Sequence, residues 1–114
     1  MIRASFHHDS NDKIDSFLIT GHADSGPYGQ DLVCAAVSAV TIGTINNMEK
    51  LTEAKPQVVI DEVNGGHLGC QFGKTVSHDT ELLLENLFWT LKDVEGSYPQ
   101  NIEVQVQKNK IDFD

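Results

Sequence analysis

Apolar residues recur along this chain with two different spacings, and the order of these spacings constrains the fold more than any other feature. The segments 31–51 and 77–95 place apolar residues three and four positions apart, the spacing of one face of an α-helix. Several shorter segments around them alternate apolar with polar residues, which is typical of strands with one covered face. The resulting order, ββαββαβ, predicts an α+β fold, a two-layer α/β sandwich with two helices packed against a mixed β-sheet.

Turn-forming residues predict two hairpins. Residues 1–19 form the first, because alternating segments flank the sequence Ser-Asn-Asp-Lys at 10–13. The strands 58–60 and 68–72 form the second, through the Asn-Gly-Gly sequence at 64–66. Together these hairpins supply four of the strands of the expected sheet.

Capping residues indicate where the two helices begin and end. Asp31 is an N-cap residue type, because its side chain can accept from backbone N–H groups of the first turn, and the helix that follows is expected to run to about Leu51. Ser77 begins the second helix, and Gly96 is expected just past its end, with Pro99 as a stop.

The first strand's end and the chain's tail are expected to be solvent-facing. His7 and His8 end the first strand and are interpreted as exposed rather than as ligands. The last strand alternates from Ile102 to Val106, and the tail 108–114 is expected to be frayed or to lie at a sheet edge.

Length and composition indicate a single domain over residues 1–114. No apolar run approaches the roughly 18 residues of a membrane span, and no signal peptide is recognisable, so no membrane partner is expected. Two cysteines without an export signal indicate the reducing cytoplasm, and a disulfide between Cys34 and Cys70 is therefore not expected.

The acidic charge excludes one class of partner. The formal net charge of -9 argues against direct binding to nucleic acid, because a phosphate backbone needs a basic face. The same charge is compatible with basic partners, but taken by itself it is better explained by an acidic surface kept for solubility.

The stretch 21–38 carries the residues with catalytic chemistry. His22 follows the apolar run that ends the second strand, and Cys34 falls at the third position of the first helix. A helix N-terminus lowers a thiol pKa from about 8.5 towards neutrality, and a nearby imidazole can take the proton. Alternatively, Cys34 is a core residue, since cysteine is among the most buried residue types.

A metal site and a redox site can both be weighed against this interpretation. His67 and Cys70, with His22 and Cys34, would supply four ligands. Residues three apart on a strand face opposite sides, so His67 and Cys70 cannot hold one ion without a bulge, and neither a metal nor another cofactor is expected. Cys70 is instead interpreted as an inert core thiol, and the absence of a Cys-x-x-Cys sequence argues against a thiol redox protein.

The stretch 21–38 also resembles one known family. Gly-His-Ala at 21–23, followed by Gly29-x-Asp31-x-Val-Cys-Ala-Ala-Val-Ser38, is similar to the ribosomal-processing cysteine protease family Prp. The match is dense over 21–38 and looser elsewhere, where the order and spacing of elements still agree. The resemblance implies a cysteine endopeptidase that removes the N-terminal extension of bacterial large-subunit ribosomal protein number twenty-seven, and it implies a homodimer. The apolar stripe of the second helix is wide, with Leu83 and Trp89 near its edges; core packing is its favoured explanation, and a dimer contact over part of it is the alternative.

The resemblance assigns roles to individual residues. Cys34 is the nucleophile, and His22 is the general base that later protonates the leaving amine. The position of the cysteine, rather than the resemblance, leads us to expect that backbone N–H groups at the helix start, including that of Cys34, hold the oxyanion. Asp31 either caps the helix, which we favour, or orients His22, and the Ser38 hydroxyl points either to the site or back to its own helix.

The loop between the second strand and the first helix is expected to act as a lid over the substrate. The residues expected to take part in this lid are Gly21, Gly26, Tyr28 and Gly29. A plain surface loop is the alternative. The alternative function, from another class, is a non-catalytic ribosome-associated binding protein in which His22 and Cys34 are structural.

Overall fold

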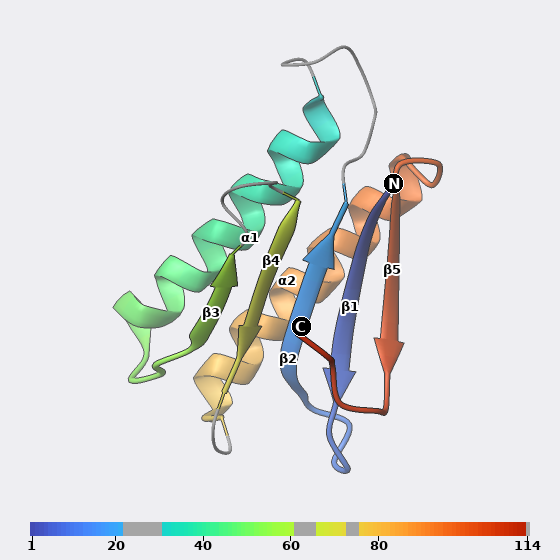
Figure 1. The fold of residues 1–114 in the computed structure, drawn as a ribbon. Coiled ribbons are helices and arrows are strands. Elements are labelled where there is room, and N and C mark those ends of the chain that lie inside the picture. The colour runs from blue at the N-terminus through green and yellow to red at the C-terminus, as the bar shows by residue number, and fades with distance from the viewer. Residues whose placement is uncertain (22–30, 61–65, 73–75, 114) are drawn as a thin grey trace.

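The fold was analysed in a computed structural model that describes residues 1–21, 31–60, 66–72 and 76–113. Five strands and two helices follow one another in the predicted order (Figure 1). Their bounds are β1 Ile2–His8, β2 Ile14–Thr20, α1 Leu32–Leu51, β3 Gln57–Ile60, β4 His67–Gln71, α2 His78–Ser97 and β5 Ile102–Gln107.

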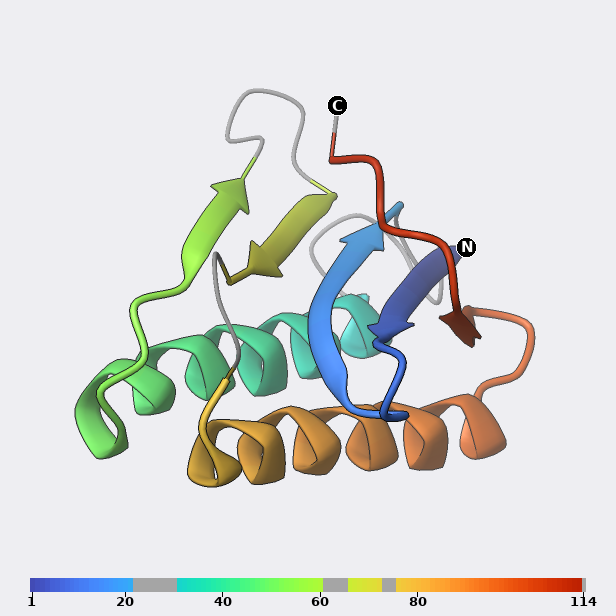
Figure 2. The same cartoon turned by 90° about the horizontal axis from the view of Figure 1, so that it is seen from below.

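The strands form one mixed sheet in the order β3-β4-β2-β1-β5. β1 pairs in parallel with β5, and the remaining pairs, β1 with β2, β2 with β4 and β3 with β4, are antiparallel. Both helices lie on the same face of this sheet, and no helix of the described residues covers the other face (Figure 2). The structure confirms the predicted two-layer sandwich.

The hydrophobic core lies between the sheet and the two helices. Phe6 of β1 contacts Phe17 of β2 and Phe88 of α2, with ring centroids 5.6 and 5.2 Å apart. Apolar side chains on the sheet-facing sides of the two helices complete the core. They are Val33, Val37, Ile45 and Met48 of α1 and Leu84, Leu87 and Leu91 of α2. The helical spacing in the sequence therefore marks the buried face of each helix correctly.

The second helix begins where it was expected but ends later. The Ser77 hydroxyl accepts from the Thr80 N–H, which confirms Ser77 as its N-cap. Gly96 lies inside α2 and not past its end, because the Tyr98 N–H still donates to the Val94 carbonyl and continues the helix to Ser97. Among the described glycines, positive φ values occur at Gly21 and Gly66, so the expected left-handed cap at Gly96 is wrong.

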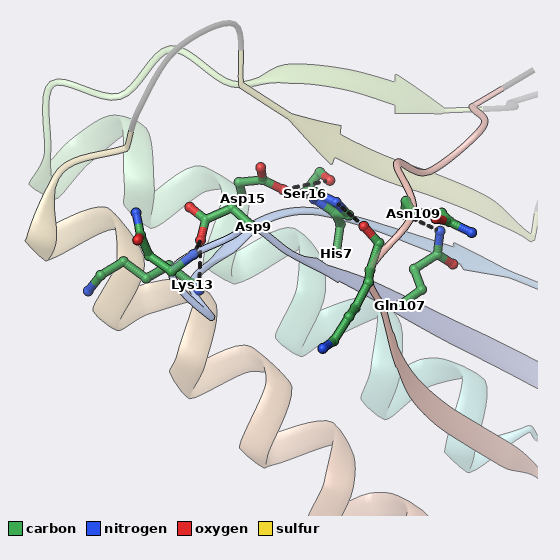
Figure 3. Close-up of polar contacts among 9 residues, drawn as sticks. His7, Asp9, Lys13, Asp15, Ser16, Gln107 and Asn109 are labelled. Carbon is green, nitrogen blue, oxygen red and sulfur yellow. Dashed lines mark hydrogen bonds and ion pairs between the residues drawn. The ribbon is translucent and has the colours of Figure 1, made fainter.

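His7 is buried, which corrects its interpretation as a solvent-facing residue. Its Nδ1 lies 2.6 Å from Asp15 Oδ1, and its Nε2 lies 3.1 Å from the Lys108 carbonyl oxygen (Figure 3). His8 is half-buried, and its Nε2 makes no hydrogen bond within the described part of the chain. The sequence could not show this environment, because Lys108, which supplies the carbonyl beside His7, is 101 positions away from it in the chain.

The tail after β5 packs against the sheet and is neither frayed nor a strand. It turns back across the face opposite the helices (Figures 1 and 2). The ring of Phe113 covers Gly69 so closely that a Cβ at position 69 would lie 2.9 Å from it. A glycine in β4 thus makes room for an aromatic ring of the tail.

α1 is long and apolar enough to cross a membrane, by its length and composition alone. The expectation that no apolar run approaches a membrane span is wrong for this helix. In the structure α1 packs one face against the sheet, as core helices of the same length and composition do.

Candidate active site

Cys34 lies in the first turn of α1, at the third helical residue, as predicted. Asp31 has the extended backbone of an N-cap, and its Oδ1 accepts from the Cys34 N–H at 3.0 Å. The structure therefore confirms Asp31 as the helix cap. The cap sets the direction of the first turn and with it the position of the thiol.

The same hydrogen bond bears on one donor of the expected oxyanion hole, which stays a prediction. The Cys34 N–H already donates to the Asp31 carboxylate, so in this structure it is not available to a developing oxyanion. An oxyanion could use this donor only after breaking the cap.

A cavity of about 240 Å³ opens beside Cys34. Ser38 also lines it, which confirms that the two side chains share one face of α1. Among the described residues the Ser38 hydroxyl makes no hydrogen bond, either toward the site or back to its own helix. The described residues that line it are Ile2, Ile19, Gly21, Cys34, Val37, Ser38, Thr41, Ile42, Ile60, Gly66, His67 and Leu68.

The part of the lining that comes from described residues is mostly apolar and carries no carboxylate or amine side chain. Low polarity strengthens every electrostatic interaction that a bound substrate makes there. The cavity suits an uncharged side chain of a substrate whose reacting bond lies at Cys34.

Of these lining residues, sequence reasoning singled out Gly21, Cys34 and Ser38 as site residues and missed the others, among them Thr41, Ile42 and Ile60. Thr41 and Ile42 lie seven and eight positions after Cys34, so the helical spacing that identified Ser38 could have found them. Thr41 is fully buried, and its hydroxyl makes no hydrogen bond within the described residues. Ile60 gave no such signal, because the sequence does not say which strand lies beside α1.

Gly21 fixes the chain directly before the predicted base. Its φ is +87°, and a Cβ at this position would lie 2.3 Å from the Met1 carbonyl oxygen. Its N–H donates to the Gly66 carbonyl at 2.7 Å. His22 and the lid residues Gly26, Tyr28 and Gly29 lie outside the described residues.

The second cysteine is a core residue, as predicted. Cys70 is fully buried, and burial, with a smaller contribution from the charge of Glu49, raises the pKa of its thiol to about 12. Cys34 and Cys70, both in the described part of the chain, form no disulfide. Within that part, no three His, Cys, Asp or Glu side chains gather in a way that could hold a metal ion.

Known proteins similar to this chain are cysteine proteases. The family model for cysteine protease Prp matches residues 1–103. The chain is 36% identical over 92 residues to the ribosomal processing cysteine protease Prp of Staphylococcus aureus, covering 81% of this chain and 86% of that protein. The protein of the same name from Bacillus subtilis is 34% identical over 108 residues, covering 91% and 96% of the two chains.

Solved structures share the fold. The S. aureus ribosomal processing protease Prp with a covalently linked product peptide has a TM-score of 0.89 at 33% identity, covering 94% of this chain and 100% of that chain. The same protease with a substrate peptide has a TM-score of 0.83 at 31% identity, with the same coverage. Because the family match starts at the first residue and reaches β5, and the solved relatives have the same arrangement of strands and helices, this chain belongs to the Prp family of cysteine proteases.

Proposed function

We propose that this cysteine protease removes the N-terminal extension of bacterial large-subunit ribosomal protein number twenty-seven, with Cys34 as nucleophile and His22 as general base. The observation that carries the proposal is the position of Cys34, in the first turn of α1 and on the wall of an apolar cavity. The names of the relatives, ribosomal processing proteases, support a ribosomal protein as the substrate.

The reaction proceeds through an acyl-enzyme. His22 takes the Cys34 thiol proton, and the thiolate attacks the carbonyl carbon of the scissile peptide bond. The tetrahedral intermediate collapses to a thioester as the C–N bond breaks, and His22 returns the proton to the leaving amine. Water, activated by the same imidazole, then hydrolyses the thioester and releases the second product with the thiol restored. Asp31 holds the first turn of α1 in place during these steps.

The proposal extends to partners and location. The enzyme acts in the cytoplasm as a homodimer, without direct contact to nucleic acid or membrane. The net charge of -9 supports attraction to basic ribosomal proteins and opposes binding of phosphate backbones. Trp89 of α2, 60% exposed and hydrogen-bonded to Glu85, is a candidate dimer contact.

Incubating the purified protein with the unprocessed ribosomal protein tests this function. We expect mass spectrometry to show the mature protein and the released extension as two products. A stable complex without any cleavage would instead support the non-catalytic ribosome-associated protein.

A further inference from the structure

β3 is an edge strand of the sheet and lies next to the candidate active site. In the described residues it pairs with β4 alone, so its other edge presents backbone N–H and C=O groups that no strand uses. Its sequence, Gln-Val-Val-Ile, carries none of the charges or prolines with which proteins usually block an exposed edge. Such an edge can accept an additional strand.

Two of the three apolar side chains of β3 lie on the sheet face that the helices cover, and both are poorly covered. Val58 and Ile60 pair with Cys70 and Leu68, and directly paired residues lie on the same face of a sheet. Because Cys70 is buried in the core, this face is the one that the helices cover. Nevertheless, Val58 is 36% exposed and Ile60 is 53% exposed. On the facing helix, Ile42 is 46% exposed.

This apolar strip is continuous with the cavity beside the nucleophile. Ile42 and Ile60 line the same cavity as Cys34. Eight residues of α-helix separate Cys34 from Ile42, a rise of roughly 12 Å, which an extended peptide spans in about four residues. α1 is also free of charged residues from Leu32 to Met48, so a neutral chain can follow it without burying a charge.

We propose that the substrate binds as an additional strand on the free edge of β3, about four residues from the scissile bond. Its backbone pairs with β3, and its alternate side chains lie on the strip formed by Ile42, Val58 and Ile60. This inference rests on the proposed proteolysis and adds where the substrate binds away from the reacting bond. The occupant is the substrate rather than a second copy of the chain, because the strip leads into the cavity that contains Cys34.

A scan with N-methylated peptides tests the backbone pairing. The probes are synthetic peptides that span the cleavage site of ribosomal protein twenty-seven, each with one backbone amide methylated. Along a strand, alternate N–H groups face the same neighbour, so methylation should weaken binding with a period of two residues. Binding is measured with the inactive Cys34→Ala protein. A peptide methylated at a sensitive position should bind it with a Kd about fivefold higher than the unmethylated peptide, which is the effect of one lost hydrogen bond. Equal sensitivity at every remote position would overturn the inference.

Side-chain variants test the strip. Ile60→Ser and Ile42→Ser should each raise KM by about tenfold with little change in kcat, because they remove apolar contacts away from the reacting bond. Val106→Ser is the matched control, since Val106 is 44% exposed on β5 at the opposite edge of the sheet. It should leave both constants unchanged. Unchanged thermal midpoints show that the three variants fold.

The outcomes separate this inference from the proposed function. If the wild-type enzyme cleaves the parent peptide but Ile60→Ser and Val106→Ser behave alike, the binding site on β3 is wrong while the proteolysis stands. If Ile60→Ser alters the oligomeric mass and leaves KM unchanged, the edge is a contact between copies and the inference is also wrong. Absence of cleavage by the wild-type enzyme would contradict the proposed function itself.

Discussion

Asp31 connects the backbone at the start of α1 to the reactive thiol. Its carboxylate accepts from the Cys34 N–H at 3.0 Å. The nitrogen of this N–H is two bonds from Cβ, the carbon that carries the thiol. A carboxylate this close would oppose thiolate formation, but a charge that is neutralised by a backbone donor does so less. The structure thus supports a capping role for Asp31, and this role can be separated experimentally from an orienting role toward His22.

We expect Asp31→Asn to keep the thermal midpoint and to retain activity within about a hundredfold of wild type, because an amide oxygen can still cap the helix. Asp31→Ala is the matched variant that removes the cap, and it should lower stability by about 1 kcal/mol. The measurements are the cleavage rate and the thermal midpoint of both variants. An unchanged midpoint with an activity loss of about ten-thousandfold in Asp31→Asn would make Asp31 a catalytic third member.

The two cysteines should differ strongly in reactivity. An alkylating reagent at pH 7 is expected to modify Cys34 well before Cys70, because burial raises the Cys70 pKa to about 12 and excludes the reagent. Peptide mapping after timed labelling measures the order. Cys34→Ala serves as the control. In this variant only Cys70 remains, and we expect it to be labelled only when the protein unfolds. Earlier modification of Cys70 would refute the assignment of the nucleophile.

Local residue chemistry explains which of these positions could be predicted from sequence. The cap at Asp31 and the places of Cys34 and Ser38 on one helix face depend on neighbours within one turn, so the sequence alone indicates them. His7 could not be predicted, because its partner at Lys108 belongs to a segment that returns from the far end of the chain. Ile60 was missed for the same reason, since its relation to the site depends on strand order.

Glu95 of α2 uses both carboxylate oxygens, one to join β5 and the other within its own helix. One oxygen accepts from the Val104 N–H at 2.6 Å and the other from Lys92 Nζ at 2.8 Å. The Lys92 hydrogen bond and then the Val104 N–H hold the pKa of Glu95 below its ordinary value of 4.5. A lowered carboxyl pKa stabilises the fold above the ordinary value, and this contribution is lost as the pH falls through the lowered one.

Glu95→Gln should therefore lower the free energy of unfolding by about 1 kcal/mol at pH 7, since an amide has a single acceptor oxygen and so loses one of the two hydrogen bonds as well as the charge assistance. The difference from wild type should shrink below pH 4.5. Urea denaturation at pH 7, 5.5 and 4 measures it, with Glu103→Gln on the exposed side of β5 as the control. A difference that grows on acidification has the wrong sign for this account.

The order of the elements and the approximate extent of each helix could be predicted from the sequence, whereas the exact residue at which an element ends could not always be. Twenty-residue α1 ends at Leu51 as expected, because its apolar spacing and cap agree. α2 runs past Gly96, because a glycine tolerates helical as well as left-handed backbone and the Tyr98 N–H continues the hydrogen bonding. Propensity alone cannot decide between these two conformations.

At the scale of the whole molecule, the tail is a strap that connects distant parts of the sheet. It brings the Lys108 carbonyl to His7 of β1 and the Phe113 ring to Gly69 of β4. The strap lies on the sheet face opposite the helices and beyond residues 1–103 of the family match. It therefore contributes to stability from the side of the sheet away from the candidate active site.

Removing residues 108–114 should lower the free energy of unfolding by about 2 kcal/mol, chiefly from the lost hydrogen bond between His7 and Lys108 and the partly buried ring of Phe113, while the exposed hydrogen bond between Gln107 and Asn109 adds little. Cleavage activity at temperatures well below unfolding should remain. Denaturant titration and a cleavage assay measure the two effects, and Phe113→Ala should show a smaller loss of the same kind. Loss of cleavage with an intact fold would show that the strap reaches the active site.

The central claim is that Cys34 and His22 perform the cleavage as one unit. The most direct test is the rate at which Cys34→Ala, His22→Ala and the double variant cleave the unprocessed ribosomal protein, with thermal midpoints as the folding control. We expect each single variant to lose essentially all cleavage and the double variant to lose little more, because residues that act together are not additive. Substantial turnover by the folded Cys34→Ala protein would contradict the account.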